Sequence, residues 1–361
     1  MKELCRHFGT CGGCAFQDLS PEDYRALKRT QVANALARCG VDAPIAPLAE
    51  TPPHTRRRAS LKAVKRDGEV LVGFNAARSH AIVDMQECLV LTPALLSLVP
   101  GLRELLRRLL KEGELAEVGV TETDSGVDLV LGLPARNFAG HVALLAEWAN
   151  RQNVARITVN GDVAVQLGSP AIRIGEADLL LPTSAFLQPS REGERILQTA
   201  VVEFLHGARC IADLFAGCGT FTFALARLAR VHGVDSDAEA LNLLRLAARK
   251  TARLKPVTVE TRDLFKRPLR PEELNGFDAI VLDPPRAGAR SQSAMLGQSQ
   301  VGRVAYVSCN PETFARDAAI LTQAGFRLGE AKPVDQFLWS KHIELVGTFE
   351  RQPRWSRRRK N

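Results

Sequence analysis

The sequence of 361 residues has no uninterrupted apolar run of membrane-spanning length, and its first nine residues contain no apolar signal core. Neither a membrane protein nor a secreted one is indicated, so we expect a cytoplasmic protein without a membrane partner. Internal repeats are also missing, which argues against a repeat architecture. With 45% hydrophobic residues, the chain is long enough for two or three domains that each have a core.

Acidic residues are scarce in two segments that carry the excess of positive charge. The chain has 48 Lys and Arg residues against 40 Asp and Glu, a net charge of +8. Residues 56–66 and 351–361 each contain six basic residues and no acidic one. Local clusters of this kind favour contacts with nucleic-acid phosphates. A solvated face and an unstructured tail are the alternatives.

The eight cysteines argue against a disulfide framework in a cytoplasmic protein and favour metal-binding or catalytic roles. Cys5, Cys11 and Cys14 form a C-x5-C-x2-C pattern, and Cys88 is the candidate fourth ligand. Zinc ribbons usually pair two CxxC motifs, and only one is present here. The pattern therefore favours an iron-sulfur cluster over zinc, with free buried thiols as the remaining alternative.

The pattern of apolar residues predicts a smaller domain before a larger one. Residues 21–38 form a predicted helix, and residues 41–168 contain short strand-like segments interrupted by one helix. We expect four parts: a Cys-rich segment with a helix (1–40), a central α+β, mainly antiparallel domain that binds RNA (41–170), a third domain (171–350) and a basic tail (351–361).

Strands and helices alternate from residue 174 onward, which is the signature of a parallel sheet. Five strands are predicted at 210–217, 231–236, 257–263, 277–285 and 303–310, and a closing hairpin is predicted at 326–335 and 342–351. This is the layout of a Rossmann-like, seven-stranded class I methyltransferase sheet. The predicted fold class is therefore α/β.

The turns after these strands predict a site for an adenosine-containing cofactor. Gly217 and Gly219 lie where the first strand passes into a helix, but the third glycine of a dinucleotide fingerprint is missing. Asp235 ends the second strand and can accept both ribose hydroxyls. Asp263 ends the third strand and is a candidate for the adenine amine, with a helix-capping role as the alternative.

Two residues predict carbon methylation rather than amine methylation. Amine methyltransferases carry an aromatic residue after Asp-Pro-Pro, whereas Arg286 follows Asp283, Pro284 and Pro285 here. Cys309 follows an apolar strand and is placed to act as a nucleophile, because ligands and catalytic groups collect at the carboxyl ends of parallel strands. Glu344 is the candidate base, with a surface strand position as the alternative.

Together these motifs resemble the RNA uracil-5 methyltransferase family over nearly the whole length. The resemblance is carried by the four cysteines, AFLQ at 185–188, DLFAGCGTF at 213–221, GVD at 233–235, DPPRAG at 283–288, SCNP at 308–311 and HIE at 342–344. It departs from the family at Asp235, where glutamate is usual, and at Ser190, where asparagine is usual. The β-barrel that begins many members is not found before Cys5.

The resemblance implies a reaction and its residues. Gln188, Phe215, Asp235 and Asp283 would contact S-adenosylmethionine, Cys309 would be the nucleophile, Glu344 the base, and Cys5, Cys11, Cys14 and Cys88 the ligands of a 4Fe-4S cluster. The implied substrate is a single-stranded or loop uridine, as in the shorter bacterial members that modify large-subunit ribosomal RNA, and we expect a monomer. Transfer RNA, methylation of a cytosine or amine, and an inactive RNA-binding scaffold are the alternatives.

Overall fold

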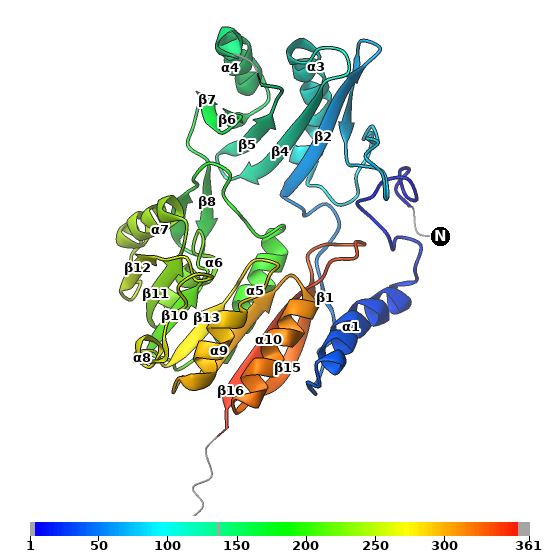
Figure 1. The fold of residues 1–361 in the computed structure, drawn as a ribbon. Helices are drawn as coiled ribbons and strands as arrows, with labels where there is room; N and C mark the ends of the chain where they lie inside the picture. Colours follow the sequence, from blue (N-terminus) through cyan, green and yellow to red (C-terminus); the bar gives the residue numbers. More distant parts are fainter. Residues whose placement is uncertain (1–3, 136–137, 353–361) are drawn as a thin grey trace, which may run out of the picture.

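The computed structural model describes residues 4–135 and 138–352, which form a central domain and a C-terminal domain (Figure 1). The central domain is built on a six-stranded sheet, and the C-terminal domain on an eight-stranded sheet. All of the predicted basic tail except its first two residues lies outside the described residues. Within those residues, no helix has the length and apolar character needed to cross a membrane.

The C-terminal sheet has the strand order β1-β15-β16-β14-β13-β10-β11-β12. Its strands are β1 (Ala49–Glu50), β10 (Cys210–Leu214), β11 (Arg230–Asp235), β12 (Val257–Thr261), β13 (Ala279–Leu282), β14 (Arg303–Ser308), β15 (Phe326–Asp335) and β16 (Glu344–Arg351). Strands β10 to β14 are parallel, and β16 runs antiparallel between β14 and β15. This confirms the predicted class I methyltransferase architecture. The sheet has eight strands rather than seven because the two-residue β1 pairs with the edge strand β15.

Helices cover both faces of this sheet. They are α1 (Pro21–Arg38), α5 (Arg191–Phe204), α6 (Thr220–Ala226), α7 (Ala238–Lys250), α8 (Pro271–Leu274), α9 (Arg290–Gln298) and α10 (Pro311–Gln323). Successive residues of a strand face opposite sides. Ile280 of β13 therefore packs with the residues of α1, α9 and α10, whereas Val281 packs with those of α5 and α6. A hairpin of β8 (Ala171–Ile174) and β9 (Ala177–Leu180) covers α7.

The central domain has the strand order β3-β2-β4-β5-β6-β7 and is antiparallel except between β5 and β6. Its elements are β2 (Arg58–Arg66), β3 (Glu69–Gly73), α2 (Pro93–Ser97), α3 (Val99–Leu109), β4 (Leu115–Thr123), β5 (Gly126–Gly132), a 3-10 turn (Ala139–His141), α4 (Val142–Arg151), β6 (Val154–Val159) and β7 (Asp162–Gln166). The leucines of α3 are buried in the core. Between β3 and α2, Asn75 and Ile82 form an isolated bridge.

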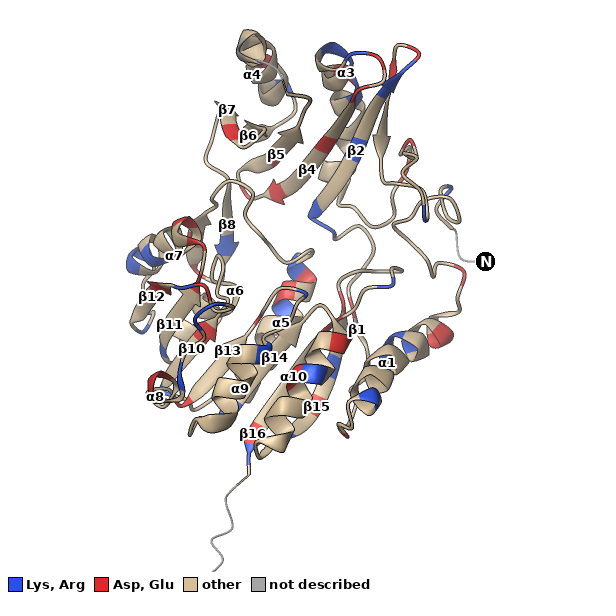
Figure 2. Cartoon of the chain, viewed as in Figure 1, with Lys and Arg blue, Asp and Glu red and all other residues tan. Residues whose placement is uncertain are grey.

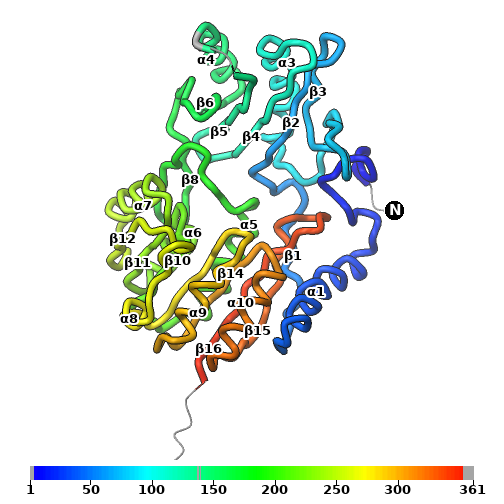
Figure 3. The backbone as a smooth tube through the Cα atoms, in the orientation of Figure 1, coloured from blue at the N-terminus to red at the C-terminus, as the bar shows by residue number. Residues whose placement is uncertain are grey.

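The N-terminal helix α1 lies beside α10 and β15, away from the central sheet (Figures 1 and 3). Ser20 caps it, and Val32 and Leu36 are buried in the same core as Phe314 of α10. Strand β1 also joins the C-terminal sheet. The predicted boundary at residue 40 thus falls between two elements that both contact the C-terminal domain.

Candidate active site

Four predicted site residues meet at one edge of the C-terminal sheet. Asp235 ends β11, Asp283 follows β13 and Cys309 follows β14. The carboxyl ends of these parallel strands share one edge. Strand β16 runs antiparallel to β14 with Ser308 opposite Leu345, so Glu344 lies beside the position of Cys309. The fold therefore brings together a thiol and carboxyl groups that are far apart in the sequence.

The turn after β10 has the shape of a ligand-binding loop. Phe215, Gly217 and Gly219 all have positive φ angles, of 65°, 51° and 92°. A Cβ atom on Gly219 would lie 2.8 Å from the Leu244 side chain, and the φ of 92° disfavours any residue with a side chain there. The Gly217 amide donates to Asp235 over 2.9 Å. Asp235 therefore holds this turn in shape, and its carboxylate keeps further lone pairs for ribose hydroxyls.

Asp263 closes the turn that follows β12, whereas the helix-capping role that was the alternative to adenine binding belongs to no helix at this position, because α8 begins at Pro271. Its Oδ1 accepts hydrogen bonds from the amides of Phe265 and Lys266 over 3.0 and 3.2 Å. The ring of Phe265 packs against Phe215, with 5.4 Å between ring centroids. These two rings form an apolar wall beside the turn after β10. A contact of Asp263 with adenine stays a prediction.

A chain of buried amide groups connects the site carboxyl groups. The Nε2 of Gln336 donates to Gln188 over 2.7 Å and to Glu344 over 2.9 Å. The Nε2 of Gln188 donates in turn to Asp283 over 3.2 Å. Gln188, Gln336 and Glu344 are each at most 3% exposed. Sequence reasoning missed Gln336, because nothing in the segment around it marks a residue that faces the site.

Burial and mutual repulsion raise the pKa values of the site carboxyl groups. Burial and the nearby Asp283 raise the pKa of Glu344 to about 8. Burial and Asp213 raise the pKa of Asp283 to about 7. Asp213, inside β10, is fully buried, and its Oδ1 has no hydrogen-bond partner in the described chain. These groups can hold or release protons near neutral pH, as a general base requires.

Cys309 lies in a polar pocket of about 310 Å³. Burial, Glu344 and Asp283 raise the pKa of its thiol to about 11, while Arg286 acts in the opposite direction. Arg286 and His342 also line the pocket. Protonation of the two carboxyl groups would remove the negative charge that disfavours a thiolate. The proton state of Glu344 and Asp283 is therefore coupled to the nucleophilicity of Cys309.

Arg57 is a structural residue rather than the predicted phosphate contact. Its side chain is 2% exposed and forms an ion pair with Glu194 at 2.5 Å. Its Nε donates to the carbonyl of Gln188 over 3.0 Å, and its amide donates to the carbonyl of Pro189 over 2.8 Å. Arg57 thus ties the start of the central domain to the loop that carries Gln188.

Other residues of the 56–66 segment are also engaged within the protein, although Figure 2 shows the segment as basic. Lys62 pairs with Glu117, and Lys65 donates to the last carbonyl groups of the α3 region. The guanidinium group of Arg58 lies 4.9 Å from the ring centroid of Phe186, which is 62% exposed. The segment as a whole is therefore not a free phosphate-binding surface, but Arg58 and Phe186 are accessible to a ligand.

The four predicted cluster cysteines lie near one another, although they come from two segments. Burial raises the pKa of Cys14 to about 12, and Cys88, Cys11 and Cys5 add to this effect despite a hydrogen bond from Gln17 that lowers it. However, no group of three or more His, Cys, Asp or Glu residues within 4–135 and 138–352 is arranged to hold a metal ion. The structure therefore does not show the predicted iron-sulfur segment.

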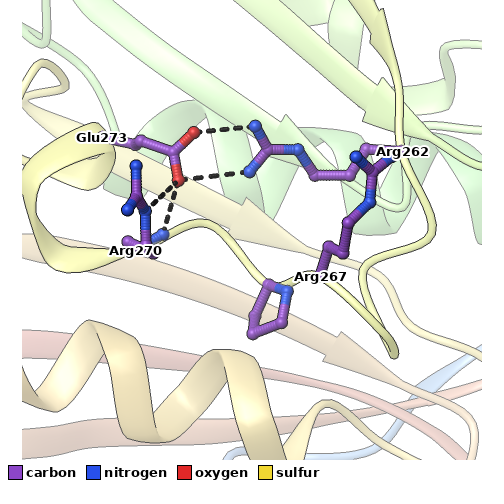
Figure 4. Close-up of a pocket in the computed structure, with 5 residues that line it drawn as sticks. Arg262, Arg267, Arg270 and Glu273 are labelled. Carbon is purple, nitrogen blue, oxygen red and sulfur yellow. Dashed lines mark hydrogen bonds and ion pairs between the residues drawn. The ribbon is translucent and has the colours of Figure 1, made fainter.

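A second pocket, of about 370 Å³, lies after β12 and contains none of the predicted site residues. Figure 4 shows Glu273 between Arg262 and Arg270, with Arg267 on the far side. Arg262 and Arg270 lower the pKa of Glu273 to about 2. Because the arginines are close to a carboxylate, this pocket is less cationic than its arginine content indicates.

Known proteins that are similar to this chain are RNA methyltransferases. The family described as tRNA (Uracil-5-)-methyltransferase matches residues 180–352. An RNA methyltransferase of Rhizobium meliloti is 42% identical over 96% of this chain and 85% of its own length. The 23S rRNA (uracil(1939)-C(5))-methyltransferase of Thiobacillus denitrificans is 34% identical over the same shares. The structure of Pyrococcus abyssi tRNA (uracil-54, C5)-methyltransferase with S-adenosyl-L-homocysteine has a TM-score of 0.74 at 26% identity, covering 94% of this chain and 84% of that one.

Proposed function

We propose a specific reaction for this chain, which belongs to the S-adenosylmethionine-dependent RNA uracil-5 methyltransferase family. The chain methylates carbon 5 of one uridine in 23S ribosomal RNA. The ribosomal substrate is supported by the relative from Thiobacillus denitrificans. Such a substrate implies a cytoplasmic enzyme, and a monomer stays our expectation. Methylation of transfer RNA is the second candidate, because the Pyrococcus abyssi enzyme acts on tRNA.

The observation that carries the mechanism is the position of Cys309 beside Glu344 and Asp283. Carbon 5 of uracil is a poor nucleophile, so we propose that the Cys309 thiolate first adds to carbon 6 and gives an enolate. Carbon 5 of the enolate then takes the methyl group that S-adenosylmethionine supplies. Glu344 removes the proton from carbon 5, the bond between carbon 6 and sulfur breaks, and the thiolate leaves.

Gln188, Phe215, Gly217, Asp235 and Asp283 are the residues that we propose for binding S-adenosylmethionine. The turn held by Asp235 offers backbone close to the ligand, and Phe215 offers an apolar face. Ser190, at a position where the family usually has asparagine, caps α5 by accepting a hydrogen bond from Gly193 over 3.0 Å. This departure therefore keeps a capping group next to the Gln188 loop.

We also propose that Cys5, Cys11, Cys14 and Cys88 bind a 4Fe-4S cluster. The proposal is supported by the pKa values of Cys11, Cys14 and Cys88, which burial raises and the neighbouring cysteines raise further. Thiols this close to one another suit a metal, which stabilises neighbouring thiolates. Iron and acid-labile sulfide should be found in protein purified without oxygen and should be lost in a Cys11→Ser, Cys14→Ser variant. Stoichiometric zinc, or no metal, would contradict this assignment.

The proposed function is tested by mass mapping of ribosomal and transfer RNA from cells with and without the gene. We expect one 5-methyluridine in 23S rRNA to disappear and to return with the wild-type gene but not with Cys309→Ala. Loss of the mark from transfer RNA would favour the second candidate. Loss of methylcytidine or of a methylated amine, or no loss at all, would contradict uracil methylation.

A further inference from the structure

Helix α1 forms one wall of the pocket that contains Cys309. Gln31, Asn34 and Arg38 of this helix line the pocket. Their spacing of three and four residues places them on one face of the helix, whereas Val32 and Leu36 lie in the core. The pocket therefore has a polar wall from a segment more than 250 residues before the nucleophile in the chain.

This wall is held rigidly. The Nζ of Lys28 lies 2.9 Å from Asp335, and both side chains are fully buried. Lys28 also donates to the carbonyl of His342, in the segment that leads to Glu344. Such interactions fix the helix relative to the catalytic segment, as a binding surface requires.

Gln31 presents a buried acceptor that lacks a donor. Its Oε1 has no hydrogen-bond partner among the residues that the structure describes. A buried polar atom without a partner costs about 1–3 kcal/mol and calls for an explanation. The atom itself is closed to solvent, whereas the Gln31 side chain is half-buried and lines the pocket, so a ligand with a hydrogen-bond donor would satisfy this atom once the amide group turns toward the pocket. A uridine nucleotide carries two such groups, the ring N3–H and the ribose 2′-hydroxyl.

The charge of the pocket fits a phosphodiester. Arg38, Arg286 and Lys341 line it together with one carboxylate, Glu312. Arg38 pairs with Glu312, but both side chains are more than half exposed, so this pair is weak and a phosphate can compete for Arg38. The cationic excess and the free acceptor therefore point to the same kind of ligand, a nucleotide within an RNA strand.

We propose that the polar face of α1 is part of the RNA-binding pocket: Gln31 accepts a hydrogen bond from the nucleotide that enters beside Cys309, and Arg38 contacts its phosphate. This inference rests on the proposed function and extends it to residues outside the methyltransferase motifs. It predicts that changes in α1 alter affinity for RNA without altering affinity for S-adenosylmethionine.

The first test is Gln31→Met in the full-length protein, with Thr30→Ala on the exposed side of the same helix as the matched control. The ligand is the RNA fragment that contains the mapped site, and binding is measured by titration in the absence of methyl donor. Loss of a neutral hydrogen bond should weaken RNA binding roughly three- to tenfold for Gln31→Met. Thr30→Ala should bind as the wild type does. Affinity for S-adenosylmethionine should stay unchanged in both.

The source of the donor is identified with two altered fragments, one with 2′-deoxyuridine and one with 3-deazauridine at the site. If the wild type and Gln31→Met bind one of these fragments with equal affinity, that fragment lacks the group that Gln31 contacts. A second variant, Arg38→Gln, should lower the slope of log affinity against log salt by about one.

The inference would be overturned if Gln31→Met bound RNA as tightly as the wild type does and Arg38→Gln kept the wild-type salt dependence. It would also be overturned if these variants lost as much affinity for S-adenosylmethionine as for RNA. If the wild-type protein methylates no RNA, the proposed function fails instead.

Discussion

The role of Gln336 gives the sharpest prediction about how the site controls its base. Its Nε2 donates to Glu344 over 2.9 Å in a buried setting. This hydrogen bond favours the ionised form and lowers the pKa of Glu344, which burial and Asp283 otherwise raise to about 8. In Gln336→Met the ionised form loses this donor. The pKa of Glu344 should therefore rise further.

The size of the shift follows from the strength of such a bond. Hydrogen bonds to charged groups contribute about 1.5–3 kcal/mol, and about 1.4 kcal/mol corresponds to one pKa unit. The pKa of Glu344 should therefore rise by roughly one to two units. Because Glu344 must be ionised to take the proton from carbon 5, the single-turnover rate should rise with pH through this pKa. Below it, the variant should be roughly ten- to hundredfold slower than the wild type.

The assay is the pH dependence of single-turnover methylation at saturating RNA and S-adenosylmethionine. Gln292→Met is the matched control, because Gln292 is also buried and its amide group bonds to the backbone of Leu269 instead of a site carboxyl group. This control should lose stability, but its methylation rate should rise with pH over the same range as in the wild type. An unshifted limb in Gln336→Met would refute the assigned link between Gln336 and the base.

Two further predictions concern stability. Arg57→Met should lower the free energy of unfolding in urea by roughly 3–5 kcal/mol, because it leaves Glu194 buried without its partner. The double variant Arg57→Met, Glu194→Met should recover most of this stability. An equal loss of stability in the single and the double variant would contradict a buried ion pair. A glutamate has an ordinary pKa of 4.5, and folding raises the pKa of Glu344 to about 8, so between these values the folded state keeps a proton that the unfolded state releases. Its contribution to stability should fall as pH rises from about 4.5 to about 8, and Glu344→Gln should flatten this fall in unfolding measurements across that range.

The C-terminal sheet could be predicted from the sequence because its central strands are short continuous apolar runs that alternate with helical segments. The segments predicted at 210–217 and 303–310 contain β10 and β14 but extend two or three residues too far, so that Phe215 and Cys309 lie just after the observed strands rather than inside them. The two-residue β1 has no such signal, since two residues show no periodicity. Its pairing with β15 is a contact between segments almost 300 residues apart and was beyond sequence reasoning.

The roles of single polar residues were harder to predict than the elements that carry them. Arg57 counts as positive charge in the sequence, but the structure buries it against Glu194. Gln336 and Gln31 have no sequence signal, because an amide side chain becomes informative only when its partners, or their absence, are known. An aspartate inside an apolar strand, as at Asp213, is a signal that could have been used, since buried acids there call for an explanation.

The central claim, that the thiol of Cys309 bonds to the pyrimidine ring, is tested most directly with RNA that carries 5-fluorouridine at the mapped site. Fluorine at carbon 5 leaves no proton for Glu344 to remove, so the adduct should persist. Intact-protein mass spectrometry should then show the protein joined to methylated RNA, with the bond mapped to Cys309 and no adduct in Cys309→Ala. Methyl transfer to normal RNA by Cys309→Ala at the wild-type rate, or an adduct on another residue, would contradict the account.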